Sequence, residues 1–320
     1  MATRHSRIVD RALTRLKLRQ LRLLVAVGQH GSIQNAARDL GISQPAATKM
    51  IQDLELDFEV KLFERTNRGV VPTVFGAALI RHGKLIFAQV SNAAQELDDL
   101  SEGNSGRVVV GTLLAASPGL LPIAVERLLQ DRPKVAVKIV EGTNEVLMPA
   151  LLSGEIDMVV GRLPSHRHRS KIVQEKFFDE RVVAVGGMQH PLANVANISF
   201  EQLMTFGWIL PPIETTLRRQ TDQFFVRQGQ YVPGVAIESV SYLANRSLLR
   251  SHDFIGLMPA HVATLDVENG LLTELDWAVP FGAGPVGVSH RGEQSLSPAG
   301  STFLEALRMA AARLQGGDQG

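Results

Sequence analysis

Apolar residues near the start of the chain recur at helical spacing in three successive stretches. The pattern predicts a helix over residues 18–29, a short helix over residues 32–40 and a longer helix that begins after Ser43. Gly31 and Gly41 separate these stretches, and a glycine at such a position can end a helix. Ser32 and Ser43 are residue types that favour the first cap of a helix. The spacing therefore predicts a helix-turn-helix preceded by one further helix.

The third predicted helix has an apolar stripe of Ala47, Ile51, Leu54 and Phe58 and a polar outer face near its start. Glutamine can pair with adenine, lysine with guanine or phosphate, and threonine with a thymine methyl group. Such a face is typical of a recognition helix in a DNA major groove, although any small helical hairpin can have a polar face. The predicted DNA-contacting residues here are Ser32, Asn35, Ser43, Gln44, Pro45, Thr48 and Lys49.

Two short apolar runs at residues 60–63 and 70–72 flank a polar, basic tip. Gly69 stands where a tight turn needs a glycine, so the pattern predicts a β-hairpin wing. We expect Arg65 and Arg68 at its tip to meet phosphates or the minor groove. Contacts of this kind position a protein on DNA and do not read its sequence.

A long helix is predicted from Thr73 to about residue 100. Apolar residues recur every seven positions in two series, which together form a coiled-coil seam. This seam predicts dimerisation, and the alternative is a helix that lies on its own domain. The predicted dimerisation residues are Leu79, Ile86, Val90, Ala93 and Leu97. Residues 102–106 then resemble a hinge, because they combine glycine with small polar residues.

Strands and helices alternate from residue 107 onwards. Strands are predicted at 108–113, 135–140, 156–161, 181–185, 208–210, 235–238, 254–258, 271–275 and 286–290. Helices are predicted at 120–130, 145–153, 200–204, 217–228, 242–251 and 298–314. This order indicates two α/β lobes with mostly parallel sheets and right-handed crossovers.

Polar residues follow several predicted strands at the edge where ligands of open parallel sheets bind. Backbone N–H groups, hydroxyls and one guanidinium would suit a small anion such as a carboxylate, or a hydroxyl-rich sugar. The predicted effector-binding residues are Ser117, Thr143, Asn144, Arg162, Pro211, Thr215 and Thr216.

Four of these residues also have a purely structural interpretation. Ser117, Thr143 and Thr215 are suited to capping helices, and Arg162 to a surface ion pair. Phe178, Trp208 and Tyr242 could add aromatic contacts, although core packing is the favoured role for each. The basic tract at 166–171 contains two histidines, but flanking cations make it a poor metal site, so we interpret it as a solvated loop.

The composition adds one observation, the uneven distribution of charge along the chain. The 320 residues carry 33 Lys and Arg against 32 Asp and Glu, but residues 1–90 hold 14 of the former and 7 of the latter. A basic head on an acidic body suggests a polyanionic partner, although a solvated basic face is the alternative.

The absence of cysteine excludes disulfides, thiolate metal sites and a cysteine nucleophile, and it suits the cytoplasm. No apolar stretch approaches the ~18 residues of a membrane span. Residues 1–20 lack the apolar core of a signal peptide, so export is not expected.

These motifs together resemble the LysR-type transcriptional regulators. The resemblance lies in S-I-x-x-A-A-x-x-L-x-I-S-Q-P-A at 32–46, L-E at 54–55, K-L-F-E-R at 61–65, P-T at 72–73 and G-E-I-D at 154–157. Glu59 stands where the family usually has glycine, and Lys49 where arginine is commoner. Residues 46–49 and the extended N-terminus are similar to the subgroup that regulates galactose-binding proteins and protocatechuate catabolism.

The resemblance implies an α/β protein with an all-α, winged-helix head. It implies a DNA-binding domain at 1–73, a dimerising linker helix and hinge at 74–106, and an effector-binding domain at 107–320. The last resembles periplasmic binding proteins, with lobe one at 107–164 and 282–315 and lobe two at 165–281.

The same resemblance implies a sequence-specific regulator of transcription in the cytoplasm, without a cofactor or enzymatic activity. Its expected partners are an interrupted inverted repeat in double-stranded DNA, a small effector, further copies of itself in a dimer or tetramer, and RNA polymerase. The alternatives are an α/β enzyme or a solute-binding protein with an accessory helical domain. The sequence lacks the common hydrolase, zinc-protease and phosphate-loop motifs, and the basic head does not suit a solute-binding protein.

Overall fold

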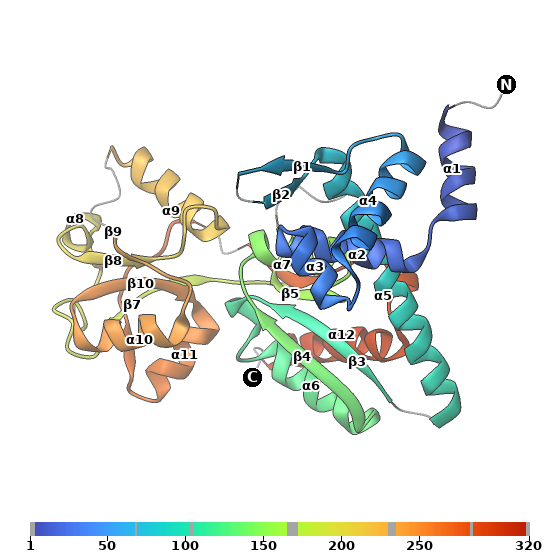
Figure 1. Ribbon diagram of the computed structural model, residues 1–320. Helices are drawn as coiled ribbons and strands as arrows, with labels where there is room; N and C mark the ends of the chain where they lie inside the picture. The colour runs from blue at the N-terminus through green and yellow to red at the C-terminus, as the bar shows by residue number, and fades with distance from the viewer. Residues whose placement is uncertain are drawn as a thin grey trace. The chain divides into compact units, whose positions relative to one another are not determined.

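The computed structural model describes residues 4–67, 69–102, 105–164, 172–229, 235–281 and 284–317. It divides into two compact units, Met1–Ser91 with Ser153–Glu155, and Asn92–Leu152 with Ile156–Gly320 (Figure 1). The predicted wing residue Arg68, residues 103–104 of the predicted hinge and the basic tract at 166–171 lie outside the described residues.

The first unit contains the predicted helices and hairpin, with helix ends shifted by one or two residues and the first strand of the wing shifted by three. Its elements are α1 (Arg4–Arg15), α2 (Leu18–His30), α3 (Ile33–Asp39), α4 (Gln44–Phe58), β1 (Phe63–Thr66), β2 (Gly69–Pro72) and the first part of α5 (Val74–Glu102). Helix α1 was not predicted, and its apolar residues Val9 and Leu13 are exposed. It contacts the end of α4 through an ion pair between Arg11 and Glu59 at 2.8 Å.

Local sequence explains the turns of the helix-turn-helix. Gly31 ends α2 in the left-handed region, with φ at 59°. The hydroxyl oxygens of Ser32 and Ser43 accept N–H hydrogen bonds from Asn35 at 3.3 Å and Ala46 at 3.4 Å. The helices then bury a common apolar core, which includes Leu24, Ala36, Ala37, Ala47, Ile51 and Leu54. Alanine at the two central positions of α3 lets the neighbouring helices approach closely.

The wing is fixed to the turn between α2 and α3. The backbone N–H of Val70 donates to the carbonyl oxygen of Gly31 at 2.9 Å. Gly69 has φ at 130°, and a Cβ atom there would overlap that same carbonyl oxygen. Only glycine therefore allows this approach, which explains the conformational requirement at Gly69.

The first sheet of the second unit has the strand order β4-β3-β5-β12-β6. Its strands are β3 (Ser105–Thr112), β4 (Lys134–Glu141), β5 (Met158–Arg162), β6 (Val173–Asp179) and β12 (Pro285–His290). Strand β3 is parallel to β4 and β5, whereas β12 is antiparallel to β5 and β6. Helices α6 (Leu120–Asp131) and α12 (Pro298–Gly317) cover one face, and α7 (Asn144–Ser153) covers the other.

The second sheet has the order β11-β7-β10-β8-β9. Its strands are β7 (Val182–Gly187), β8 (Gly207–Leu210), β9 (Val235–Glu238), β10 (Phe254–Pro259) and β11 (Leu272–Glu274). Alternate residues of β7 face opposite cores. One core contains α8 (Phe200–Leu203) and α9 (Thr216–Arg227), and the other contains α10 (Tyr242–Ser251) and α11 (Ala260–Glu268).

The structure corrects the sequence-based predictions at several points of this unit. Strand β6 was not predicted, and it pairs with β12 in the first sheet rather than belonging to a second lobe that begins at residue 165. The sheets are mixed and not mostly parallel, because β12 and β7 run against their neighbours. Helix α11 was also not predicted. Trp208 is fully buried in the core of the second sheet, which agrees with the core-packing role favoured from the sequence.

Glu59 allows a test of backbone strain at the end of α4. It has φ at 55°, a region that costs most residues about 1–2 kcal/mol. Its partly exposed ion pair with Arg11 contributes less, about 0.2–1 kcal/mol. Glu59→Gly should therefore raise the thermal midpoint of the DNA-binding unit, measured by calorimetry on the full chain. Glu59→Gln keeps the strain and should lower it slightly; a glycine variant that unfolds before the glutamine variant contradicts this explanation.

Candidate DNA-binding surface and ligand cavity

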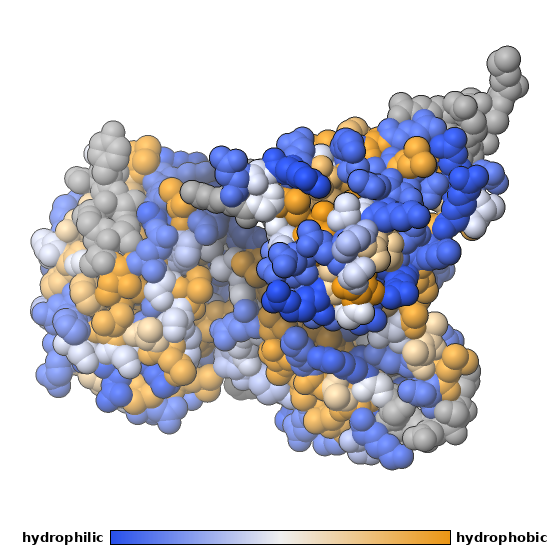
Figure 2. Space-filling model, viewed as in Figure 1, coloured by the Kyte–Doolittle hydropathy of each residue, from blue (hydrophilic) through white to orange (hydrophobic). Residues whose placement is uncertain are grey.

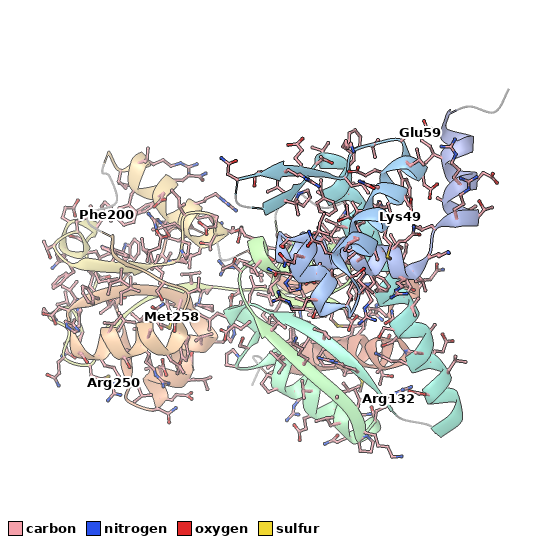
Figure 3. The ribbon with its side chains drawn as sticks, in the orientation of Figure 1. Lys49, Glu59, Arg132, Phe200, Arg250 and Met258 are labelled. Atoms are coloured by element: carbon pink, nitrogen blue, oxygen red, sulfur yellow. The ribbon has the colours of Figure 1, made fainter. Side chains whose placement is uncertain are left out.

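The start of α4 presents an exposed polar surface. Of the predicted DNA-contacting residues on α3 and α4, Asn35, Ser43, Gln44, Pro45 and Lys49 are exposed, and Ser32 and Thr48 are half-buried. Figure 3 labels Lys49 on α4, and Figure 2 shows mainly hydrophilic residues around α3. The first turn of α4 contains no acidic side chain, so its backbone N–H groups and helix dipole favour an anion such as phosphate.

Some predicted contacts have a structural role as well. Ser32 and Ser43 cap α3 and α4, so their hydroxyl oxygens already accept backbone hydrogen bonds. Arg65 lies on β1 as an exposed residue of the wing, opposite Val70. Arg68 is not among the described residues, so its contact with DNA stays a prediction.

Helix α5 presents only part of the predicted dimerisation seam. Leu79 packs on the apolar core of its own head, and a Cβ atom on Gly83 would lie 3.3 Å from Val25 of α2. Leu79 is thus half-buried against its own head, and its role in dimerisation stays a prediction. Further along, Ile86, Val90 and Leu97 are 38%, 49% and 67% exposed, and Ala93 is exposed as well.

All the predicted effector-binding residues line one cavity of about 720 Å³ in the second unit. They come from the ends of β3, β4, β5 and β8 and from the helix starts that follow. The sequence rule that places ligands at strand ends therefore gathers the right residues in space.

Three residues that line this cavity have a buried polar atom without a hydrogen-bond partner among the described residues. They are Asn144 at Oδ1, Arg162 at Nε and Asn245 at Oδ1. Asn144 Nδ2 donates to the Arg162 carbonyl at 3.0 Å, and Asn245 Nδ2 lies 3.5 Å from the Ser239 carbonyl, the limit of a hydrogen bond. Both unpartnered amide atoms are therefore acceptors.

Arg162 forms a buried ion pair rather than the surface pair considered from the sequence. Its Nη2 lies 3.4 Å from Glu180 Oε2, and the side chains are 10% and 2% exposed. Glu180 Oε1 also lies 2.6 Å from Nδ1 of His261 on α11. Burial lowers the pKa of the Arg162 guanidinium, although the charge of Glu180 opposes this effect.

Two of the predicted hydroxyls are already engaged. Thr215 caps α9 by accepting from the Arg218 N–H at 3.4 Å, and its own hydroxyl donates to the Pro212 carbonyl at 2.8 Å. Ser117 lies 3.3 Å from the Leu113 carbonyl, to which it donates. Thr215 is therefore a helix cap, as the structural interpretation predicted. The Ser117 hydroxyl is bound to the backbone of the turn that precedes it.

Sequence reasoning missed Ser239, Ser241 and Asn245, which line the cavity between β9 and the first turns of α10. The same strand-end rule would have found the two serines. Tyr242 also lines the cavity, and its hydroxyl donates to Asp266 at 2.7 Å. Burial, with the nearby Asp266 carboxylate, raises the pKa of Tyr242 to about 12.

Within the described ranges, no helix combines the length and apolar character needed to cross a membrane. A winged helix-turn-helix, joined by a long helix to an α/β domain whose cavity is lined by apolar residues and a few polar groups, defines a ligand-responsive DNA-binding regulator. Family models of the bacterial regulatory helix-turn-helix protein, lysR family, and of the LysR substrate binding domain match residues 18–77 and 101–312. The chain belongs to the LysR family of transcriptional regulators.

Individual relatives agree with this assignment. The chain is 33% identical to the transcriptional regulator GbpR of Azospirillum brasilense, over 92% of this chain and 87% of that protein. It is 31% identical to the regulator PcaQ of Agrobacterium fabrum, over 94% and 96%. The crystal structure of the LysR-family regulator CbnR has the same fold, with a TM-score of 0.65 at 21% identity, over 92% of this chain and 99% of that chain. The chain is thus a DNA-binding transcriptional regulator with an effector-binding domain, and not an enzyme.

Gln44 tests whether the start of α4 reads bases. Gln44→Ala should weaken binding to a site selected from random DNA by about 1–3 kcal/mol, because a bidentate contact with adenine is lost. Binding to nonspecific DNA should change little, since phosphate contacts remain. Fluorescence anisotropy at fixed salt measures both affinities. Gln29→Ala, which changes an exposed glutamine at the end of α2, is the control; equal losses on both DNAs would exclude base reading by Gln44.

Proposed function

We propose that the chain controls transcription through a small polar effector, a carboxylate or a sugar-like molecule, bound in the cavity of the second unit. The observation that carries this proposal is the gathering of the predicted residues around one cavity, with unpartnered polar atoms on Asn144, Arg162 and Asn245. A buried polar atom without a partner costs about 1–3 kcal/mol, which a ligand hydrogen bond offsets. These polar atoms would orient a ligand, whereas the apolar residues of the lining, among them Leu113, Leu217 and Val240, would contact its carbon skeleton.

The proposed DNA target is an interrupted inverted repeat in double-stranded DNA. Two copies paired through α5 present two recognition helices to a two-fold site. Gln44 and Lys49 contact bases, whereas Arg65 and Arg68 contact phosphates and fix the register. The exposed position of Gln44, Lys49 and Arg65 supports these roles.

We assign DNA binding to residues 1–73, pairing to 74–106 and effector binding to 107–320, with β6 in the first lobe. Dimers pair into a tetramer, and the effector shifts the population of tetramers that hold the DNA in different shapes. This change alters contact with RNA polymerase, and the protein acts in the cytoplasm.

A thermal-shift screen of aromatic acids, sugars and sugar acids tests the cavity. Binding stabilises the folded state by RT ln(1 + [L]/Kd), which is about 2.7 kcal/mol when the ligand is at 100 times its Kd. The stabilising compound should lose most of its effect on Asn144→Ala and on Asn245→Ala. Gln130→Ala, an exposed residue of α6 away from the cavity, should respond like the parent protein. A shift that survives both cavity variants places the effector elsewhere.

Sedimentation tests the pairing helix. Ile86→Glu or Val90→Glu should lower the oligomeric state, because a carboxylate would be buried against an apolar partner helix. Leu129→Glu introduces the same charge at a residue of α6 that is 39% exposed, and it should leave the assembly intact. An unchanged assembly in both α5 variants argues against this seam.

A further inference from the structure

The groups around the cavity also constrain the charge of its ligand. Resting on the effector role proposed above, we infer that the cavity accepts an uncharged, hydroxyl-rich molecule and disfavours the carboxylate counterpart of that molecule. Three independent features of the lining lead to this selectivity: two amide acceptors without donors, a cation that already has a partner, and carboxylates at the edge.

The unpartnered amide oxygens need hydrogen-bond donors. Asn144 Oδ1 and Asn245 Oδ1 are acceptors, because the amide nitrogens face the carbonyls of Arg162 and Ser239 at 3.0 Å and 3.5 Å. Hydroxyl groups donate and accept, so one polyol can satisfy both amides. An ionised carboxylate only accepts, and it would place negative oxygens against oxygens.

The cation of the cavity is largely neutralised within the wall. Arg162 is the one Lys, Arg or His among the described lining residues. Its Nη2 already faces Glu180 at 3.4 Å, and its Nε is a buried N–H group without a hydrogen-bond partner among the described residues. A carboxylate bound in bidentate fashion needs two parallel N–H donors, and here it would share the guanidinium with a second buried carboxylate. A single hydroxyl or ring oxygen needs only Nε.

Two further carboxylates make the lining more negative. Glu141 ends β4 and Glu145 lies in the first turn of α7; both line the cavity and are exposed. Each repels an anionic ligand through solvent, which is worth roughly 0.2–1 kcal/mol for an exposed pair of charges.

The helix starts at the cavity act in the opposite direction. Helices α7, α9 and α10 each contribute residues of the first turn to the lining, and a helix N-terminus attracts an anion by about 0.3–1 kcal/mol. Glu145 offsets this attraction at α7. At α9 and α10 the hydroxyls of Thr215 and Ser241 already accept one N–H each, from Arg218 and Ala244. The repulsion by Glu141 and Glu145 is therefore of the same size as the attraction by the helix starts, so together they give an anion no large net attraction.

Calorimetric titration of the full chain with matched sugars tests the selectivity. The probes are glucose against glucuronate and galactose against galacturonate, which differ at one carbon between a hydroxymethyl group and a carboxylate. In at least one pair, the uncharged sugar should bind at least tenfold more tightly than its acid at low ionic strength. Added salt should narrow this ratio, because it screens the exposed carboxylates.

Charge variants identify the source of the ratio. Glu141→Gln with Glu145→Gln should improve binding of the acid about fivefold, the effect of two exposed charges, and leave binding of the sugar unchanged. Glu126→Gln, on the exposed surface of α6 outside the lining, removes the same charge and should change neither affinity. Equal gains in the Glu126 variant would indicate a general effect of net charge and would overturn the role of the cavity carboxylates.

The outcomes separate this inference from the effector role itself. An acid that binds as tightly as its sugar, or more tightly, overturns the selectivity while the cavity remains an effector site. Binding of neither member of any pair also overturns it. The effector role fails only if, in addition, the thermal-shift screen finds no compound whose effect depends on Asn144 or Asn245.

Discussion

The buried ion pair between Arg162 and Glu180 connects the ends of strands from the two sheets beside the ligand cavity. Arg162 ends β5 of the first sheet, whereas Glu180 lies directly before β7 of the second sheet and also contacts His261 at the start of α11. The loss of either partner would leave an uncompensated buried charge, which costs about 3–5 kcal/mol. The Arg162 carbonyl in turn fixes the amide of Asn144, so the pair orients the wall of the cavity as well as the path of the chain.

The head shows how far local sequence can predict a structure. Helical periodicity, the serine caps and Gly31 are all local signals, and they gave the helix-turn-helix with ends correct to one or two residues. Leu79 and α1 depend on long-range packing instead. The heptad pattern of α5 does not indicate that its first turns pack on the core of the head. The spacing of apolar residues likewise does not predict the ion pair between Arg11 and Glu59.

The same division holds for the second unit. The cavity residues could be predicted from the positions where strands end. Parallel strands have their carboxyl ends at the same edge of a sheet, so this prediction needs only the topology. Strand β6 was missed because it is an edge strand that mixes charged and aromatic residues, and its partner β12 lies more than a hundred residues further along the chain. Glu180 was missed for a related reason. A lone glutamate in a crossover gives no sign of burial until its partners Arg162 and His261 are placed.

The unpartnered atoms of the cavity connect its stability with its function. If each buried polar atom without a partner costs about 1–3 kcal/mol, those on Asn144, Arg162 and Asn245 together make several kcal/mol available to a ligand that supplies the missing groups. A shift from 1:99 to 99:1 between two states needs a difference in ligand affinity of about 5.5 kcal/mol. The two quantities are of similar size. A small molecule that satisfies these atoms in one conformation and not in another therefore has enough binding energy to switch the regulator, without rearrangement of the hydrophobic cores.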